Sequence, residues 1–429
     1  MSIEQIHDLF LKSTGISTDS RSIWNGCIYI ALKGERFDGN EFAKQAIEQG
    51  ASHAIVDDDA MIGVNLIQVQ DGLLTLQKLA SYHRAFCGWP TVGITGSNGK
   101  TTTKELIGAI LSSKFNILIT EGNLNNHIGV PLTILKGNDS HEIAVIEMGA
   151  SHQLDIKELC EIADPDLGLI TNIGKAHLQG MGGIDGVLKT KGELFDHIIA
   201  KNGKVLLNLN QGRLVGKYLG SEHLSFGSSK DSDVLGKTEG KSGHMKVLWR
   251  QKSSNSWHSI QTNLVGDYNL DNVLAAIAIG VEFGVNEEQI NAAIESYVPT
   301  NNRSEYVESG SNKIIWDAYN ANPSSMEYAL ENVARIDAEN LTLILGEMKE
   351  VGDTSETEHA ALVVKALLLN PTNLFLVGDG FNDHSNSRCR HFSKVQELLA
   401  LLKREPINNS LILIKGSRSN QLEKLKEVL

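Results

Sequence analysis

Short apolar runs alternate with longer stretches of helical periodicity through most of this chain. A strand that is buried on both faces reads as a continuous apolar run, and a helix after each strand returns the chain to the same edge of the sheet. The rhythm therefore predicts an α/β fold with a doubly wound, mainly parallel sheet in the middle of the chain. The strands expected there are Thr91–Thr95, Asn116–Thr120, Ile143–Glu147, Leu167–Asn172 and Lys204–Asn208.

The alternation continues on both sides of this block, and the length of 429 residues also favours about three domains. We predict domains at residues 1–88, 89–297 and 298–429, with a break at Gly88-Trp-Pro90. The polar stretch Gly220–Thr262 is expected to add short antiparallel strands to the central sheet. The first domain is predicted to hold strands at Cys27–Leu32, Ala54–Val56 and Leu66–Val69 and helices at Glu41–Gln49 and Leu73–Phe86. The third is predicted to hold strands at Lys313–Trp316, Leu341–Leu345, Leu374–Val377 and Leu411–Ile414, each followed by a helix.

Composition is that of an ordinary globular protein, with 41% apolar and 21% charged residues. No apolar run approaches the roughly 18–20 residues of a membrane helix, and the N-terminus lacks the apolar segment of a signal peptide, so we expect a cytoplasmic protein without membrane insertion. The scattered cysteines argue against a disulfide framework or a thiolate zinc site. The formal net charge of −13 argues against nucleic-acid binding, so local cations and backbone amides would have to meet any anionic ligand.

A glycine-rich turn between an expected strand and an expected helix carries the strongest chemical signal. Glycines let backbone N–H groups converge on an anion, and a helix N-terminus adds a partial positive charge. Lys100 would reach the β- and γ-phosphates of a nucleotide, and the Thr101 hydroxyl would reach a bound Mg²⁺. The strict spacing G-x-x-x-x-G-K-T is not met, and the alternative is an ordinary strand–helix connection. The nucleotide-binding candidates in this turn are Gly96, Ser97, Asn98, Gly99, Lys100, Thr101 and Thr102.

Two further residues follow apolar strands at the edge where an open α/β sheet binds its ligands. Glu147 ends one strand, and a carboxylate beside a phosphate loop suits Mg²⁺, although a capping or salt-bridged Glu is an equal alternative from the residue alone. His177 follows another strand in a glycine-containing loop, where it could bind metal, accept a proton or cap a turn.

Lys191 falls within the apolar stripe of the helix that starts at Ile184. The spacing predicts that its side chain points inward, where burial lowers a lysine pKa and favours the neutral amine. A lysine that extends its ammonium to solvent from the edge of the stripe is the alternative reading.

Asparagine-rich loops supply further candidates, although surface turns are their default reading. Asn125 and Asn126 lie in a polar loop that opens a helix. Arg303 could stack on a base or hold phosphate, and Asp317 could hold ribose hydroxyls, with Asn320 and Asn322 close behind it.

Together these segments resemble the Mur ligases, the ATP-dependent enzymes that build the peptide stem of peptidoglycan. The resemblance runs through the whole chain in order. It rests on Gly96–Thr102, Glu147-Met-Gly, Asn172–His177, Lys191-Gly-Glu-Leu-Phe, Tyr268–Asn272, Arg303-Ser-Glu and Asp317–Pro323. Within the family, Asp317–Pro323 and Gly346–Gly352 are similar to the member that adds the last dipeptide of the stem.

The resemblance implies an N-terminal domain for the uridine-diphosphate end of a substrate, a central ATPase domain and a mobile, Rossmann-like C-terminal domain. It implies ligation of D-alanyl-D-alanine to UDP-N-acetylmuramoyl-tripeptide through an acyl phosphate, with ATP and two Mg²⁺ sites, by a monomer. Thr18, Ser20 and Arg21 match the uridine-diphosphate pocket. Lys100 and Thr101 match phosphate and magnesium contacts, Glu147 a ligand of the first metal and His177 a ligand of the second. Lys191 matches a lysine that the family carries as a carbamate, and Asn272, Arg303 and Asp317 match contacts to adenine, ribose and phosphate.

The sequence departs from the family pattern at Asn40, His127 and Lys349, and Asn40 weakens the detail of the uridine pocket. Two alternatives stay open. One is another ligase of the superfamily, such as an amino-acid-adding Mur ligase or folylpolyglutamate synthase. The other is a regulatory P-loop NTPase, which would give no reason for Lys191 to face inward.

Overall fold

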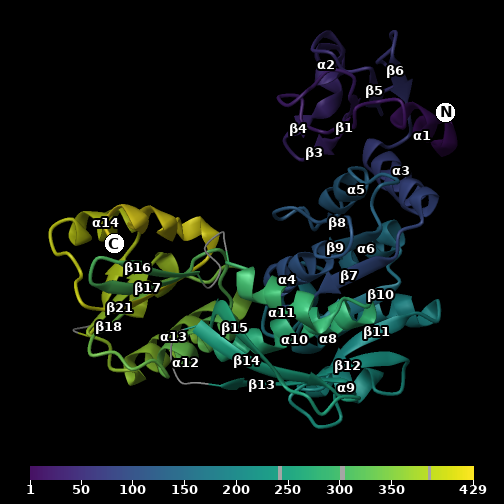
Figure 1. Ribbon diagram of the computed structural model, residues 1–429. Coiled ribbons are helices and arrows are strands. Elements are labelled where there is room, and N and C mark those ends of the chain that lie inside the picture. Colours follow the sequence, from purple (N-terminus) through teal and green to yellow (C-terminus); the bar gives the residue numbers. More distant parts are fainter. Residues whose placement is uncertain (240–243, 300–304, 385–387) are drawn as a thin grey trace.

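Three α/β units follow one another along the chain in the computed structural model (Figure 1). The structure describes residues 1–239, 244–299, 305–384 and 388–429. Each unit is built on its own sheet, of four, nine and six strands in chain order. The first and third units lie against different sides of the central one (Figure 1). We keep 88/89 and 297/298 as the proposed domain boundaries.

The N-terminal domain has a fully parallel sheet in the order β1-β2-β5-β6. The expected helix at Glu41–Gln49 starts as a 3₁₀ turn, because the Asp38 side chain accepts a hydrogen bond from Asn40 N and begins the turn earlier. Its strands are β1 (Ile16–Ser17), β2 (Ile28–Ile30), β5 (His53–Val56) and β6 (Leu66–Gln68), with a hairpin of β3 (Lys33–Gly34) and β4 (Phe37–Asp38). Its helices are α1 (Ile3–Phe10), η1 (Gly39–Phe42), α2 (Ala43–Glu48) and α3 (Gly72–Cys87).

The central sheet has the order β15-β14-β13-β12-β11-β10-β7-β9-β8, and β7 to β12 run parallel. Because successive strand residues point to opposite faces, Val145 of β9 packs with α4, α10 and α11 while Ile146 packs with α5, α6 and α8. These strands are β7 (Thr91–Thr95), β8 (Ile117–Ile119), β9 (Ile143–Glu147), β10 (Leu167–Ile170), β11 (Lys204–Asn208) and β12 (His223–Gly227). The helices are α4 (Lys100–Ser112), α5 (Gly129–Ile134), α6 (Asp155–Ala163), α7 (Leu178–Met181), α8 (Ile184–Ala200), α9 (Gly212–Tyr218), α10 (Leu270–Glu282) and α11 (Glu287–Ser296).

The expectation for Gly220–Thr262 needs correction at its start. The first strand there, β12, pairs parallel with β11 and continues the doubly wound sheet. Antiparallel pairing begins only after β13 (Val234–Glu239), with β14 (His244–Gln251) and β15 (His258–Val265). The alternating burial of β14 reflects a strand with one face on the core and one face in solvent.

The C-terminal sheet has the order β16-β17-β21-β18-β19-β20 and is parallel except at its β16 edge. Two of its expected strands are followed by 3₁₀ turns and not by the helices we predicted, namely β19 by η4 (Asp379–His384) and β21 by η5 (Arg418–Asn420) and η6 (Leu422–Glu427). Its strands are β16 (Glu305–Ser309), β17 (Asn312–Asp317), β18 (Leu341–Gly346), β19 (Asn373–Val377), β20 (Arg390–Phe392) and β21 (Leu411–Lys415). Its remaining helices are α12 (Pro323–Val333), η3 (Gly352–Thr354), α13 (Ser355–Leu368) and α14 (Val395–Leu402).

Apolar packing joins the first two domains more closely than the third. One core cluster runs from Ile6 and Leu76 of the N-terminal domain to Ile146 and Phe195 of the central domain. The C-terminal domain has its own clusters, and of the described residues of the central domain only Val265, at the end of β15, is buried within them. We therefore expect the first two domains to move as one body and the third to rotate near Val265.

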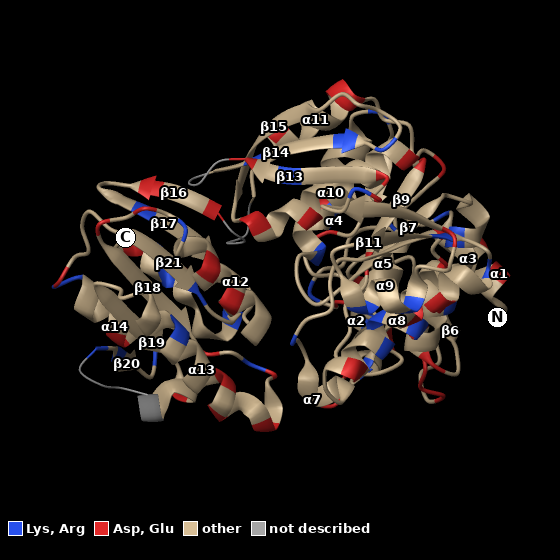
Figure 2. Cartoon of the chain, turned by 90° about the horizontal axis from the view of Figure 1, so that it is seen from below, with Lys and Arg blue, Asp and Glu red and all other residues tan. Residues whose placement is uncertain are grey.

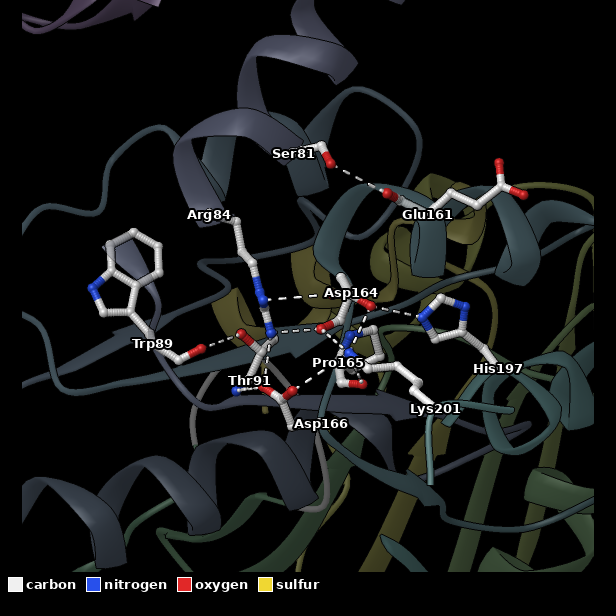
Figure 3. Close-up of polar contacts among 10 residues, drawn as sticks. All are labelled: Ser81, Arg84, Trp89, Thr91, Glu161, Asp164, Pro165, Asp166, His197 and Lys201. Atoms are coloured by element: carbon white, nitrogen blue, oxygen red, sulfur yellow. Dashed lines mark hydrogen bonds and ion pairs between the residues drawn. The ribbon is translucent and has the colours of Figure 1, made fainter. Parts of the chain in front are cut away.

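A polar network also fixes α3 to the central domain (Figure 3). It lies where β7 begins, at the opposite end of this strand from the glycine-rich turn. The Arg84 guanidinium donates to the Asp164 carbonyl at 2.6 Å and to Asp166 at 2.7 Å. Asp166 in turn accepts from the backbone of Thr91, where β7 begins. Lys201, the residue after α8, contacts Asp164, the residue after α6, at 2.7 Å. The cluster therefore joins α3 and the C-terminal ends of α6 and α8 to β7.

A buried histidine pair lies near the same junction. His7 of α1 contacts His83 of α3 at 3.0 Å, and His83 contacts the carbonyl of Gly137 in the central domain at 2.9 Å. Burial lowers the pKa of both imidazoles, and His83 lowers that of His7 further.

Lys and Arg are interspersed with Asp and Glu over all three domains (Figure 2). Within the described residues, no helix is both long and apolar enough to cross a membrane.

Candidate active site

The glycine-rich loop connects β7 to α4 and requires glycine at two positions. Gly96 has φ 145° and Gly99 has φ 79°. A Cβ at Gly96 would lie 1.9 Å from Thr171 Oγ1, and one at Gly99 would lie 2.4 Å from Asn272 Oδ1. The backbone angles and the close neighbours at these two positions exclude any residue larger than glycine. The loop therefore keeps the tight turn in which backbone N–H groups can bind an anion.

Hydrogen bonds hold this loop against the next strand end. The Ser97 hydroxyl donates to the carbonyl of Gly174 at 3.0 Å, and Asn98 N donates to Asn172 Oδ1 at 3.0 Å. Lys100 Nζ donates to the carbonyl of Gly96 at 2.7 Å, across the mouth of the loop. The lysine therefore lies over the position where phosphate oxygens would bind.

Glu147 lies beside this loop at the end of β9 and is 1% exposed. Its Oε1 accepts from Asn125 Nδ2 at 2.8 Å and from the Thr101 hydroxyl at 3.3 Å. Its Oε2 is buried with no hydrogen-bond partner among the described residues. An unpartnered carboxylate oxygen next to a hydroxyl is a donor set that suits Mg²⁺, which takes hard oxygen ligands and keeps phosphate or water in its other positions.

Lys191 faces inward, as the helical spacing predicts, and is 1% exposed. Its Nζ lies 3.5 Å from the carbonyl of Ala150. Burial lowers its pKa well below the usual lysine value, and the nearby Lys100 lowers it further. A neutral amine is the form that captures CO₂, so the environment fits a carbamate.

His177 has φ 51° and contacts Glu350 of the C-terminal domain, with Nδ1 and Oε2 2.6 Å apart. This contact lowers the pKa of the Glu350 carboxyl. In the described part of the chain, His177 shares no hydrogen bond or ion pair with Lys191 or Glu147. The structure therefore does not join Glu147, His177 and Lys191 to one another through direct contacts.

The C-terminal domain contributes the facing side. Lys415, at the end of β21, is 2% exposed and contacts Asp317 Oδ2 at 2.5 Å. Asn322 caps α12 through its Oδ1, while its Nδ2 donates to Asn98 Oδ1 of the phosphate loop at 2.8 Å. One asparagine thus begins a helix of the third domain and contacts the nucleotide loop of the second.

These elements enclose a cavity of about 730 Å³ between the central and C-terminal domains. Asn126 lines it but also accepts from Gly129 N, which ties the side chain to its own turn. Asn272 lines it while Thr103 donates to its Oδ1. The sequence-predicted residues at the cavity are Ser97, Asn98, Gly99, Lys100, Thr101, Thr102, Asn125, Asn126, Glu147, His177, Asn272, Asp317, Asn320 and Asn322.

The remaining candidates lie elsewhere. Thr18, Ser20 and Arg21 belong to the N-terminal domain and do not line the cavity, and Arg21 pairs with Asp19 at 2.8 Å. Arg303 falls outside the residues that the structure describes. Asn40, the atypical residue near the expected uridine pocket, is buried between Asp38 and Asp57 and hydrogen-bonds to both.

Sequence reasoning missed several cavity residues, among them Lys415, Asp155 and Glu350. Lys415 directly follows the apolar run Leu411–Ile414, so the rule that found Glu147 at a strand end also applies to it. Asp155 begins a helix, and no periodic signal marked it.

Comparisons with known proteins match this architecture. Three family models follow each other along the chain: "Mur ligase family, catalytic domain" at residues 12–84, "Mur ligase middle domain" at 94–280 and "Mur ligase, glutamate ligase domain" at 302–418. The UDP-N-acetylmuramoyl-tripeptide–D-alanyl-D-alanine ligase of Bacillus subtilis (strain 168) is 32% identical over 424 residues, which cover 96% of this chain and 92% of that protein. The chain therefore belongs to the Mur ligase family.

Solved structures agree along the full length. A crystal structure of MurF from Acinetobacter baumannii has a TM-score of 0.89 at 29% identity and covers 99% of this chain and 98% of that one. MurF ligase from Thermotoga maritima in complex with ADP has a TM-score of 0.88 at 26% identity, with 98% and 97% coverage. The expected three-domain α/β fold is confirmed.

Proposed function

We propose that the protein uses ATP to join D-alanyl-D-alanine to UDP-N-acetylmuramoyl-tripeptide in peptidoglycan precursor synthesis. The observation that carries this proposal is the phosphate loop facing a C-terminal domain across one cavity. Full-length similarity to ligases of that name supports the choice of substrates.

The nucleotide binds with its phosphates on the loop at Gly96–Thr102. Lys100 exchanges its hydrogen bond with the Gly96 carbonyl for contacts to phosphate oxygens. Asp317 and Asn272 face the same cavity and hold the nucleoside side, together with Arg303.

Two magnesium sites are part of the proposal. Thr101 and Glu147 hold the first cation, and His177 with the carbamate of Lys191 holds the second. Bound Mg²⁺ supplies charge neutralisation at the phosphates and at the attacking carboxylate. Glu147 supports this assignment with its unpartnered oxygen, and Lys191 with its buried amine.

The reaction has two steps. The tripeptide carboxylate attacks the γ-phosphorus of ATP, which gives an acyl phosphate and ADP. The amine of D-alanyl-D-alanine then attacks the acyl carbon, a peptide bond forms and phosphate leaves. Two anions meet in the first step, so Lys100 and the loop amides lower the barrier mainly by electrostatic stabilisation and positioning. Closure of the C-terminal domain excludes water from the acyl phosphate.

The uridine-diphosphate end binds the N-terminal domain near Thr18, Ser20 and Arg21, outside the cavity, and Asn125, Asn126, Asn320 and Asn322 contact the substrates within it. We propose that the enzyme acts as a monomer in the cytoplasm, because one chain supplies both walls of the cavity and the reaction consumes ATP.

Acceptor-dependent ADP release tests the function. We expect sustained ADP release over many turnovers only when the UDP-linked tripeptide and D-alanyl-D-alanine are both present, and at most about one ADP per enzyme with the tripeptide alone. The lysine and diaminopimelate forms of the tripeptide are assayed in parallel. ADP release with a shorter UDP-linked acceptor and a single amino acid, or with a folate, would assign the chain to another ligase reaction. Turnover without any acceptor would favour a regulatory NTPase.

A further inference from the structure

The second step of the proposed reaction needs a group that binds the amine of the incoming dipeptide. At neutral pH this amine is an ammonium, and a carboxylate with room to accept it is the natural partner in a partly dry cavity. Among the described residues, the carboxylates that line the cavity are Glu147, Asp155, Asp317 and Glu350.

Three of these carboxylates are bound to groups of their own domain. Glu147 is buried beside Thr101 in the phosphate site. Asp155 Oδ2 accepts from the backbone N–H groups of Ser151 and His152, both at 2.8 Å. Asp317 is bound by the buried Lys415.

Glu350 differs in exposure and position. Its side chain is 60% exposed, and it contacts His177 of the central domain. It lies on the domain that closes over the nucleotide, next to the loop that follows β10, at the carboxyl edge where the acyl phosphate would form.

The backbone around Glu350 is held firmly. Met348 N donates to His359 Nε2 at 2.9 Å, and Lys349 N donates to Ser417 Oγ at 3.1 Å. Glu350 itself has φ 62°, a left-handed conformation that costs strain in a non-glycine residue. Such strain in an anchored loop is a signature of a side chain positioned for function.

We propose that Glu350 binds the ammonium of the acceptor dipeptide and holds its nitrogen beside the acyl phosphate. One proton passes from the ammonium to solvent before the free amine attacks, and the second amine proton is lost with the departing phosphate as the C–N bond replaces the acyl C–O bond. This inference rests on the proposed function and adds a substrate-binding residue to it. It also links acceptor binding to domain closure, because the carboxylate arrives at the site with the C-terminal domain.

The test uses Glu350→Gln in the full-length enzyme. Loss of one charge-assisted hydrogen bond should raise the KM for D-alanyl-D-alanine about 10- to 100-fold. Acyl-phosphate formation without dipeptide, trapped with hydroxylamine, should be unchanged, because that step needs no amine.

The matched control is Glu358→Gln. Glu358 also belongs to the C-terminal domain, and it forms an ion pair at 2.5 Å with Lys175, which lies in the same loop as His177. It does not line the cavity. This variant should keep the dipeptide KM within about twofold of the parent enzyme.

A second readout changes the ligand. D-lactoyl-D-alanine has a hydroxyl in place of the amine, and its inhibition constant should be the same for the parent and Glu350→Gln enzymes. If the constants for both ligands shift together, or if acyl-phosphate formation also falls, Glu350 is a closing contact and the proposal is wrong. Parent enzyme that makes no ADP with these substrates would instead refute the function itself.

Discussion

Gly96 shows how closely single positions are fixed in the phosphate loop. A methyl group there would overlap Thr171 Oγ1, whose hydroxyl donates to the Asn98 carbonyl. We expect Gly96→Ala to weaken Mg-ATP binding at least tenfold by calorimetry, because the loop must open to relieve the overlap. Gly212→Ala is the control, since nothing lies within 4 Å of its added Cβ, and it should bind the nucleotide normally. Equal affinities in the two variants would show that the loop shape is not needed.

Lys191 is the residue whose chemistry depends most on burial. We expect Lys191→Ala to reduce ligation about 100- to 1,000-fold while Mg-ATP affinity stays within a few fold, because the cation that the carbamate would hold neutralises the reacting carboxylate and is not needed for nucleotide binding. Lys189→Ala, on the exposed side of the same helix, is the control and should ligate normally. Undiminished ligation by the Lys191 variant would exclude the carbamate.

At the scale of elements, the His7–His83 pair makes the contact of α1 and α3 with the central domain sensitive to acid. Both imidazoles have a pKa below 6.5 in the folded protein, so below this pH the unfolded chain binds more protons than the folded one. Stability should therefore fall as the pH drops from 6.5 to 5, by up to about 1.4 kcal/mol per pH unit for each histidine. Thermal unfolding across this range should show a shallower decline for His7→Phe, which keeps ring packing against Tyr82 and Phe86. An identical decline would place the acid sensitivity elsewhere.

Elements with a strong periodic pattern could be predicted from the sequence, and elements at sheet edges could not. Strands β7, β9 and β11 have the expected bounds because both of their faces are covered and their apolar runs are continuous. The edge strands β16 and β20 were missed because polar residues alternate or dominate there. The direction of β12 was also missed, since a pattern of burial does not say which neighbour a strand pairs with.

At the scale of the whole molecule, the candidate site combines residues that lie far apart in the sequence. Lys191 could be placed inward from its own helix, because helical spacing is local information. The contact of Lys415 with Asp317 joins positions 98 residues apart and depends on β17 lying next to β21. Strand order is decided by packing of the entire domain, so the sequence pattern could indicate both strand ends but not their contact.

Asn322 connects two domains, and a conservative change separates its roles. Asn322→Asp keeps the oxygen that caps α12 but removes the amide that donates to Asn98. We expect the KM for ATP to rise about 3- to 10-fold, since one interdomain hydrogen bond is lost and a carboxylate faces the bound phosphates. Thermal unfolding should stay close to that of the parent because the cap remains. An unchanged KM would mean that this contact does not stabilise the closed form.

The interface between the central and C-terminal domains contains three polar contacts, Asn98–Asn322, Lys175–Glu358 and His177–Glu350. Val265 adds an apolar contact to the same interface. Water can replace each of these polar partners at small net free-energy change, so separating them costs little as the C-terminal domain moves outward. Solution conditions should therefore shift the equilibrium between the inward and outward positions of the C-terminal domain. Higher ionic strength should favour the outward position because it screens the interdomain ion pairs, and excluded osmolytes should favour the more compact inward position.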